Sequence, residues 1–295
     1  MIDIIDLHFL DFEETIAAYV VETSEGPVLI ETGPFSTYPN LDRGLSYLGY
    51  RASDIEHVLL THIHFDHAGA AWALAEAGAT IYVHPAGHKH LLDPSRLYDS
   101  ARRIYGDQME VLWGEMQPIP EDQLLAVPDL AEITIGDTTF IAHHTPGHAV
   151  HHIAWQFEDV CFTGDVAGVS IAGGPVSPPC PPPDIDIEAW LASIARLRKL
   201  GLATLYLTHY GPIYNVDAHL DELEAMLSDW AAWMQKPWEA GRSAGEIVPA
   251  FQAYAAQQLR DKGLDEYAIN QYEAANPAWM SVAGLMRYWK KRMEG

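Results

Sequence analysis

The sequence predicts a layered α/β body followed by a helical tail. Up to about residue 215, short apolar segments of strand character alternate with helical segments and with turns rich in glycine and proline. From Asp217 onward the strand signals stop, and apolar residues recur at helical spacing. We therefore expect a body of residues 1–215 and a helical subdomain of residues 216–295, which either walls a substrate pocket or serves oligomerisation.

The first 60 residues predict four strands and one helix. Ser24-Glu25-Gly26-Pro27 is a turn sequence between two apolar segments, so these segments are expected to form a hairpin. The last strand of this region leads directly into a group of histidines. The expected elements are strands at 2–8, 15–23, 28–31 and 56–60 and a helix at 40–48.

The middle of the chain predicts two more hairpins and a stiff loop. Gly136-Asp137 separates expected strands at 133–135 and 139–143, and Glu158-Asp159 separates expected strands at 151–157 and 160–163. Residues 173–183 contain six prolines and cannot form a helix or a central strand. The other expected elements are helices at 68–77, 85–104 with a break near Pro94, and 187–200, strands at 80–84 and 202–207, and tail helices at 244–259, 265–275 and 278–292.

Composition excludes several classes of protein. The formal net charge is -24, and such a surface repels polyanions, so nucleic acid is not an expected partner. The two cysteines, Cys161 and Cys180, do not indicate a disulfide framework. The N-terminal segment lacks signal-peptide features, and no apolar run approaches the roughly 18 residues of a membrane helix. We expect a cytoplasmic protein that acts on a small-molecule substrate, and a homodimer formed through the tail is an open alternative.

Residues 61–67, Thr-His-Ile-His-Phe-Asp-His, concentrate side chains that bind metal ions. Imidazole nitrogens and carboxylate oxygens suit zinc, manganese or iron. On an extended backbone, residues two apart point to the same side, so His62 and His64 can bind one ion together. Asp66 and His67 stand where the chain must turn into the next element, so they can point to a second position nearby.

Three later segments share one pattern, in which a strand ends, a small residue or glycine turns the chain, and a ligand-type side chain follows. They are Thr145-Pro146-Gly147-His148, Thr163-Gly164-Asp165 and Thr208-His209-Tyr210-Gly211. With residues 61–67, this makes five histidines and two aspartates at strand ends. In layered α/β folds, ligand sites commonly lie at the edge of the sheet where the strands end.

In motif order and spacing, the chain resembles the metallo-β-lactamase fold superfamily over residues 1 to about 215. The resemblance implies an α+β fold, a four-layer αββα sandwich with the helical subdomain attached. It implies two bound divalent ions, with zinc favoured and iron or manganese as alternatives. The implied ligands are His62, His64 and His148 for one ion, Asp66, His67 and His209 for the other, and Asp165 as a bridge between them.

Within the superfamily, the motifs are similar to those of glyoxalase II-like hydrolases. Many members have Asp-Thr-Gly where this chain has Glu31-Thr32-Gly33, so the carboxylate there is one methylene longer. The roles of His151, His152 and Tyr210, which stand close to ligand positions, are open from the sequence. The substrate choice is expected to depend on the proline-rich loop and the helical tail.

The resemblance implies a hydrolase in which a metal-bridging hydroxide attacks a small thioester, ester or lactone, with Asp66 orienting it and accepting its proton. No lysine or spare carboxylate stands in the motifs to protonate a leaving group, so an amide is a less favoured substrate. The alternatives are a persulfide dioxygenase with one iron, a phosphodiesterase of the same fold, and a non-enzymatic binding module.

Overall fold

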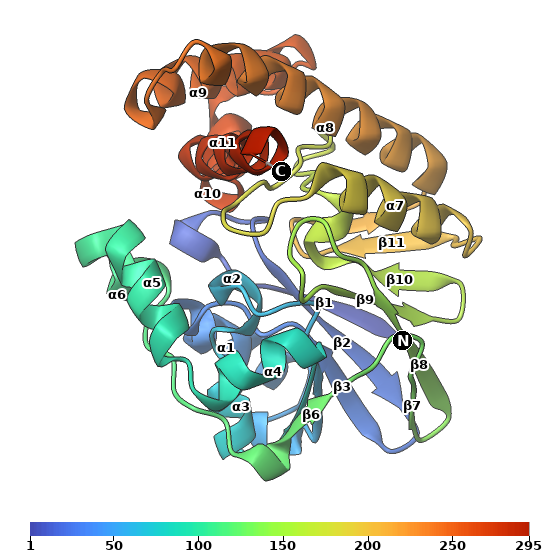
Figure 1. Cartoon of the computed structure of the whole chain (residues 1–295). Helices are drawn as coiled ribbons and strands as arrows, with labels where there is room; N and C mark the ends of the chain where they lie inside the picture. Colours follow the sequence, from blue (N-terminus) through green and yellow to red (C-terminus); the bar gives the residue numbers. More distant parts are fainter. Residues whose placement is uncertain (295) are drawn as a thin grey trace.

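The computed structural model describes residues 1–294 and contains two six-stranded sheets that face each other, with helices on their outer sides (Figure 1). The strand order is β1-β2-β3-β4-β5-β6 in the first sheet and β12-β11-β10-β9-β8-β7 in the second. The αββα sandwich implied by the resemblance is confirmed.

The first sheet and its helices come from residues 2–126. Strands β1 to β3 are antiparallel, whereas β3 to β6 are parallel and are connected through helices. The strands are β1 (Ile2–Asp6), β2 (Ala17–Thr23), β3 (Gly26–Ile30), β4 (His57–Leu59), β5 (Thr80–Val83) and β6 (Leu124–Ala126). The helices are α1 (Tyr38–Tyr47), α2 (Phe65–Ala68), α3 (Ala71–Glu76), α4 (Pro85–Leu92), α5 (Ser95–Tyr105) and α6 (Met109–Leu112).

The second sheet and the remaining helices come from residues 132–294. Only β10 and β11 pair in parallel, and the other neighbours in this sheet are antiparallel. The strands are β7 (Glu132–Ile135), β8 (Thr138–His144), β9 (Ile153–Phe157), β10 (Val160–Phe162), β11 (Thr204–Leu207) and β12 (Gly211–Ile213). The helices are α7 (Ile187–Arg198), α8 (Val216–Glu239), α9 (Ala244–Asp261), α10 (Glu266–Ala275) and α11 (Ala278–Glu294).

Strand β2 shows why the sheets stack. Its side chains alternate between the two faces, as in any strand. Ala18 and Val20 belong to the core beneath the helices of the first half. Tyr19 and Val21 belong to the core between the sheets, which also contains Trp155 of the second sheet. Both faces of the strand are therefore buried.

The tail helices pack on the outer face of the second sheet. The apolar stripe of α8, including Leu223 and Trp230, shares one core with Trp190 of α7 and Leu205 of β11. The division into domains 1–215 and 216–295 stays a prediction. None of the helices in residues 1–294 is long and apolar enough to cross a membrane.

Two local predictions were wrong. The single helix expected at 68–77 is instead the two short helices α2 and α3. They are separated at Gly69, where a Cβ atom would lie 2.4 Å from the Phe65 carbonyl oxygen and 2.9 Å from Pro34 Cα. The other error concerns strand β9, which begins at Ile153 rather than at residue 151. The short strand β12, which contains Pro212 at the sheet edge, was not predicted.

Candidate metal centre

Strand ends bring the seven sequence-predicted residues to one edge of the sandwich. His62 and His64 follow β4, and Asp66 and His67 lie on the short helix α2. The other three follow β8, β10 and β11, and they are His148, Asp165 and His209. Because these strands end at the same edge, residues almost 150 positions apart in the sequence meet there.

Three histidines form the first group, which we call the all-histidine set: His62, His64 and His148. His64 Nδ1 lies 2.8 Å from His62 Nε2 and 3.0 Å from His148 Nε2. Three ring nitrogens that converge in this way can bind one metal ion. Burial and the neighbouring histidines lower the pKa of all three imidazoles, that of His64 to about 3.

The second group, which we call the carboxylate set, consists of Asp66, His67 and His209. Asp66 Oδ2 lies 3.8 Å from His67 Nε2 and 3.6 Å from His209 Nε2. Burial alone would lower the pKa of both histidines, but Asp165 and Asp66 outweigh it and raise the pKa of each, with Glu31 adding to the effect at His67. Without a metal ion, this set therefore favours bound protons.

Asp165 lies between the two sets. Its Oδ1 is 3.2 Å from His67 Nε2 and 3.4 Å from His209 Nε2, whereas its Oδ2 is 3.3 Å from His148 Nε2. Burial would raise the pKa of this carboxyl, but the three histidines hold it well below its usual range. One ionised carboxylate thus presents one oxygen to each set.

Unpaired buried atoms test whether these residues fit metal ions. His67 Nε2, His209 Nε2 and Asp165 Oδ1 are buried and have no hydrogen-bond partner within residues 1–294. Buried polar atoms in folded proteins almost always have a partner, so three that converge on one place require an explanation. All three are electron-pair donors to a cation, so a divalent ion fits this position.

In His148 and His209, the ring nitrogen that points away from the centre forms a hydrogen bond. This leaves the ring nitrogen that faces the centre free to bind metal. His148 Nδ1 donates to the Pro179 carbonyl oxygen at 2.8 Å, and His209 Nδ1 donates to the Thr15 carbonyl oxygen at 2.6 Å. A histidine that donates from Nδ1 has its lone pair on Nε2 when neutral. Metal-binding histidines are typically held in this way.

Glu31 contacts His67 of the carboxylate set directly and His62 of the all-histidine set through Thr61. It accepts from His67 Nδ1 at 2.9 Å and from the Thr61 hydroxyl, and Thr61 Oγ1 in turn lies 3.0 Å from His62 Nδ1. Glu31, His62 and His67 are also close enough together to bind an ion. Because the Glu31 carboxylate already accepts several hydrogen bonds, we assign it the supporting role.

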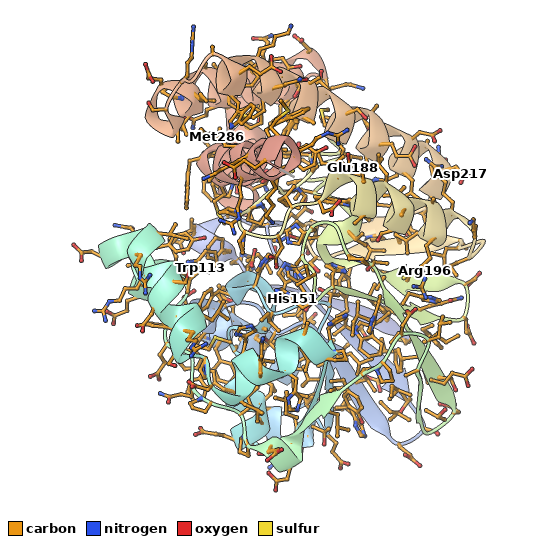
Figure 2. All side chains as sticks on the ribbon, in the orientation of Figure 1. Trp113, His151, Glu188, Arg196, Asp217 and Met286 are labelled. Carbon is orange, nitrogen blue, oxygen red and sulfur yellow. The ribbon has the colours of Figure 1, made fainter. Side chains whose placement is uncertain are left out.

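The sequence left the roles of three residues open, and His151, His152 and Tyr210 occupy different places in the structure. His152 Nε2 accepts from the Asp165 backbone N–H at 3.2 Å, and its Nδ1 lies 2.8 Å from Thr145 Oγ1, so it supports Asp165. His151 lies at the middle of the molecule and lines the cavity beside the centre (Figure 2). Its Nδ1 has no hydrogen-bond partner among the described residues 1–294. Tyr210 does not line that cavity and packs in the core.

The cavity beside the centre has a volume of about 510 Å³. Its walls include α4, α5 and the proline-rich loop, and also Trp279 and Met280 of the tail. This size is typical of small-molecule sites. The sequence could not show that the tail reaches the centre. Helix α11 does so through contacts such as the 3.2 Å approach of the Tyr105 hydroxyl to Met280 Sδ.

Several known proteins are similar to this chain in sequence or in structure. The model of the metallo-beta-lactamase superfamily matches residues 13–209. A metallo-beta-lactamase fold-containing protein from Sulfurisphaera tokodaii is 28% identical over 243 residues, 81% of this chain and 88% of that protein. The crystal structure of a metallo-beta-lactamase family protein from Thermus thermophilus matches with a TM-score of 0.71 and 20% identity, over 99% of this chain and 94% of that one.

Other relatives carry names that state an activity. An atrochrysone carboxyl ACP thioesterase from Pseudocercospora fijiensis is 25% identical over 268 residues, 86% of this chain and 66% of that protein. An N-acyl homoserine lactonase from a Bacillus species is 28% identical over 153 residues, 44% of this chain and 54% of that protein. The chain spans about half the length of lactamase-like proteins such as that of Aspergillus fumigatus, of which it covers 50%.

Proposed function

The chain belongs to the metallo-beta-lactamase superfamily, and we propose that it is a dinuclear metal hydrolase of a small thioester, ester or lactone. The observation that carries the proposal is Asp165, whose two carboxylate oxygens face two different sets of ligands. The names of the thioesterase and the lactonase among its relatives support this substrate range.

Divalent ions held by the two sets would supply Lewis acidity for the substrate carbonyl and would activate water. Asp66 has a side chain that is 20% exposed and lines the cavity. Burial would raise the pKa of this carboxyl, but His67 and His209 keep it lowered, so it is ionised. Asp66 can therefore accept a proton from the attacking water.

The nature of the leaving group favours a thioester. Among residues 1–294, lysine and arginine enter the cavity wall only as Lys89 and Arg96, which are exposed to solvent on α4 and α5. Neither belongs to the buried metal centre. A thiol has a pKa of about 8.5, so a thiolate can depart without receiving a proton, whereas an amine cannot. Thioesters are therefore expected to be better substrates than amides, with lactones and activated esters intermediate.

A hydrolysis panel on metal-loaded protein tests the proposal. It should contain acyl-thioesters, lactones, β-lactams and bis-p-nitrophenyl phosphate, with Asp66→Asn as the variant that loses the proton acceptor. We expect thioester or lactone turnover together with two metal ions per chain. One tightly bound iron per chain with oxygen uptake on a persulfide would instead support a dioxygenase, and turnover of the phosphodiester alone would support a phosphodiesterase.

A further inference from the structure

Aromatic side chains form one wall of the cavity beside the metal centre. Phe9 stacks on Trp113 with ring centroids 5.5 Å apart, and the ring centroid of Phe65 lies 6.0 Å from that of Trp113. Tyr105 meets Trp113 edge-on at 5.3 Å and Trp279 edge-on at 5.5 Å. We call these five side chains the aromatic cage. Such an arrangement favours a flat ring over a saturated chain, because aromatic pairs gain energy from offset and edge-to-face contacts.

The cage contains an unsatisfied hydrogen-bond donor. Trp113 is only 8% exposed, and its indole N–H has no partner within residues 1–294. A buried donor without a partner costs about 1–3 kcal/mol. The indole nitrogen has almost no accessible surface, so a bound ring would meet the faces and edges of the cage rather than this donor.

The exposed edge of the cavity carries positive charge. Lys89 and Arg96 line the cavity, and neither has a carboxylate within ion-pair distance in the part of the chain that the structure describes. Beside them lies His90, whose pKa is lowered by burial and by the charges of Lys89 and Arg96. Asp184 also lines the cavity. Because Lys89 and Arg96 form no ion pair within residues 1–294, they can bind an anionic group of the substrate at this edge.

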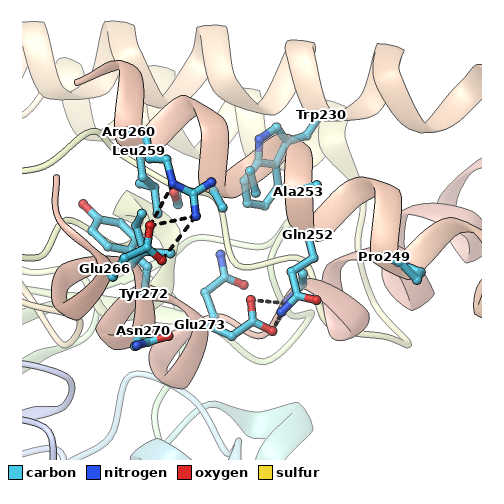
Figure 3. Close-up of a pocket in the computed structure, with 16 residues that line it drawn as sticks. Trp230, Pro249, Gln252, Ala253, Leu259, Arg260, Glu266, Asn270, Tyr272 and Glu273 are labelled. Atoms are coloured by element: carbon cyan, nitrogen blue, oxygen red, sulfur yellow. Dashed lines mark hydrogen bonds and ion pairs between the residues drawn. The ribbon is translucent and has the colours of Figure 1, made fainter. Parts of the chain in front are cut away.

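In a second cleft, the charged side chains are paired with one another. It lies between α9 and α10 and has a volume of about 370 Å³ (Figure 3). Its charged residues already have partners: Arg260 is 2.9 Å from Glu266, and Glu273 is hydrogen-bonded to Gln252. Unpaired cations are thus a property of the cavity at the metal centre rather than of every cleft in this chain.

We propose that the substrate is an aromatic acyl thioester in which the acyl ring occupies the aromatic cage and an anionic group outside the cage binds Lys89 and Arg96. This inference rests on the proposed hydrolase function. Water adds its oxygen to the acyl carbon, the carbon–sulfur bond breaks, and the products are a carboxylate, a thiol and one proton. The anion can be a phosphate on the thiol arm or a carboxylate on the acyl group.

Matched thioesters distinguish these two sources. The neutral probes are the naphthoyl and butanoyl thioesters of N-acetylcysteamine. The anionic probes are the naphthoyl thioester of 4′-phosphopantetheine and a carboxynaphthoyl thioester of N-acetylcysteamine. We expect kcat/KM to be about tenfold higher for naphthoyl than for butanoyl, and about tenfold higher again for one of the two anionic probes. The anionic probe with the higher value identifies the source of the charge.

Variants then test each recognition element. Lys89→Ala combined with Arg96→Ala should lower the ratio of kcat/KM between anionic and neutral thioesters by about tenfold. The control, Lys236→Ala with Arg242→Ala, removes the same charge from positions outside the cavity and should preserve the ratio. Trp113→Leu removes the ring that contacts three other members of the cage, so it should lower the ratio of kcat/KM between the naphthoyl and butanoyl thioesters.

Binding of the product distinguishes failure of this inference from failure of the proposed function. Quenching of tryptophan fluorescence by naphthoate measures occupation of the cage without turnover. If thioesters are hydrolysed but the charge ratio is the same in both double variants, or butanoyl is preferred, the inference is wrong and the hydrolase function stands. If no thioester or lactone is turned over, the hydrolase function fails. Absence of naphthoate binding would also contradict the cage assignment.

Discussion

The two candidate ligand sets differ in what controls the pKa of their histidines. In the all-histidine set, burial is the main influence, and it lowers the pKa of each imidazole. In the carboxylate set, the neighbouring carboxylates outweigh burial and raise the pKa of His67 and His209. The first set thus presents neutral nitrogens ready for a cation, whereas an ion at the second must displace protons. Two adjacent positions in one chain should therefore differ in how their metal affinity depends on pH.

The largest loss of bound metal and hydrolysis rate is expected from substitution of Asp165, which faces both sets. Asp165→Asn replaces a carboxylate that faces both sets with an amide that has one acceptor oxygen. We expect at least one ion to be lost and the hydrolysis rate to fall by about 10³-fold or more, because both positions lose their shared charge. Metal analysis and hydrolysis rates measure this. The control is Asp159→Asn in the exposed turn between β9 and β10, and a fully active Asp165→Asn protein with both ions would refute the shared role.

Removing one ligand from each set separates the two positions. His148→Ala should weaken the all-histidine set and His209→Ala the carboxylate set, each leaving about one ion per chain and lowering the rate about 10²-fold or more. Metal stoichiometry and cobalt spectra report which position is occupied. His88→Ala on α4 removes a histidine outside the centre and should retain both ions. Identical cobalt spectra for the two single variants would argue against two distinct positions.

A pH series measures the electrostatic difference directly. The raised pKa values of His67 and His209 mean that they stay protonated to higher pH in the metal-free protein than the lowered imidazoles of the other set. Because only the neutral imidazole binds metal, lowering the pH from about 8 to 5 should release the ion of the carboxylate set first. Metal retained after equilibration at each pH is the measurement. Simultaneous release of both ions would contradict the comparison.

The smallest effect is expected at Glu31, which supports ligands without being assigned as one. Glu31→Gln keeps the size of the side chain but removes the charge that faces His67 Nδ1. We expect the affinity of the carboxylate set to fall about 10–100-fold, with a smaller change at the all-histidine set. Competition with a chelator gives both affinities. Equal losses at both positions would show instead that the route from Glu31 through Thr61 to His62 is as important as the direct contact.

Much of the fold could be predicted because its signals are local. The turn at Gly136-Asp137 sets the β7–β8 hairpin, where Gly136 has a φ of 57°, a conformation that glycine adopts without strain. The apolar stripe of α8 likewise follows helical periodicity. The break between α2 and α3 was missed because it depends on contacts across the fold that cannot be recognised in the local sequence. The Ala70 N–H donates to the Gly33 carbonyl oxygen at 3.0 Å instead of continuing the helix, and Gly69 lies close to Pro34.

The sequence by itself determined which side chains could bind metal, and it placed them at the ends of strands. This was possible because ligand-type residues and turn residues can be recognised in short motifs. Their role as ligands stays a prediction. Only the tertiary structure decided which outer partner orients each ring, since Thr15 and His209 are 194 residues apart and Pro179 and His148 are 31 apart. The same holds for the aromatic cage and for Lys89 and Arg96, which form a substrate surface only when α4, α5, α11 and the proline-rich loop pack around one cavity.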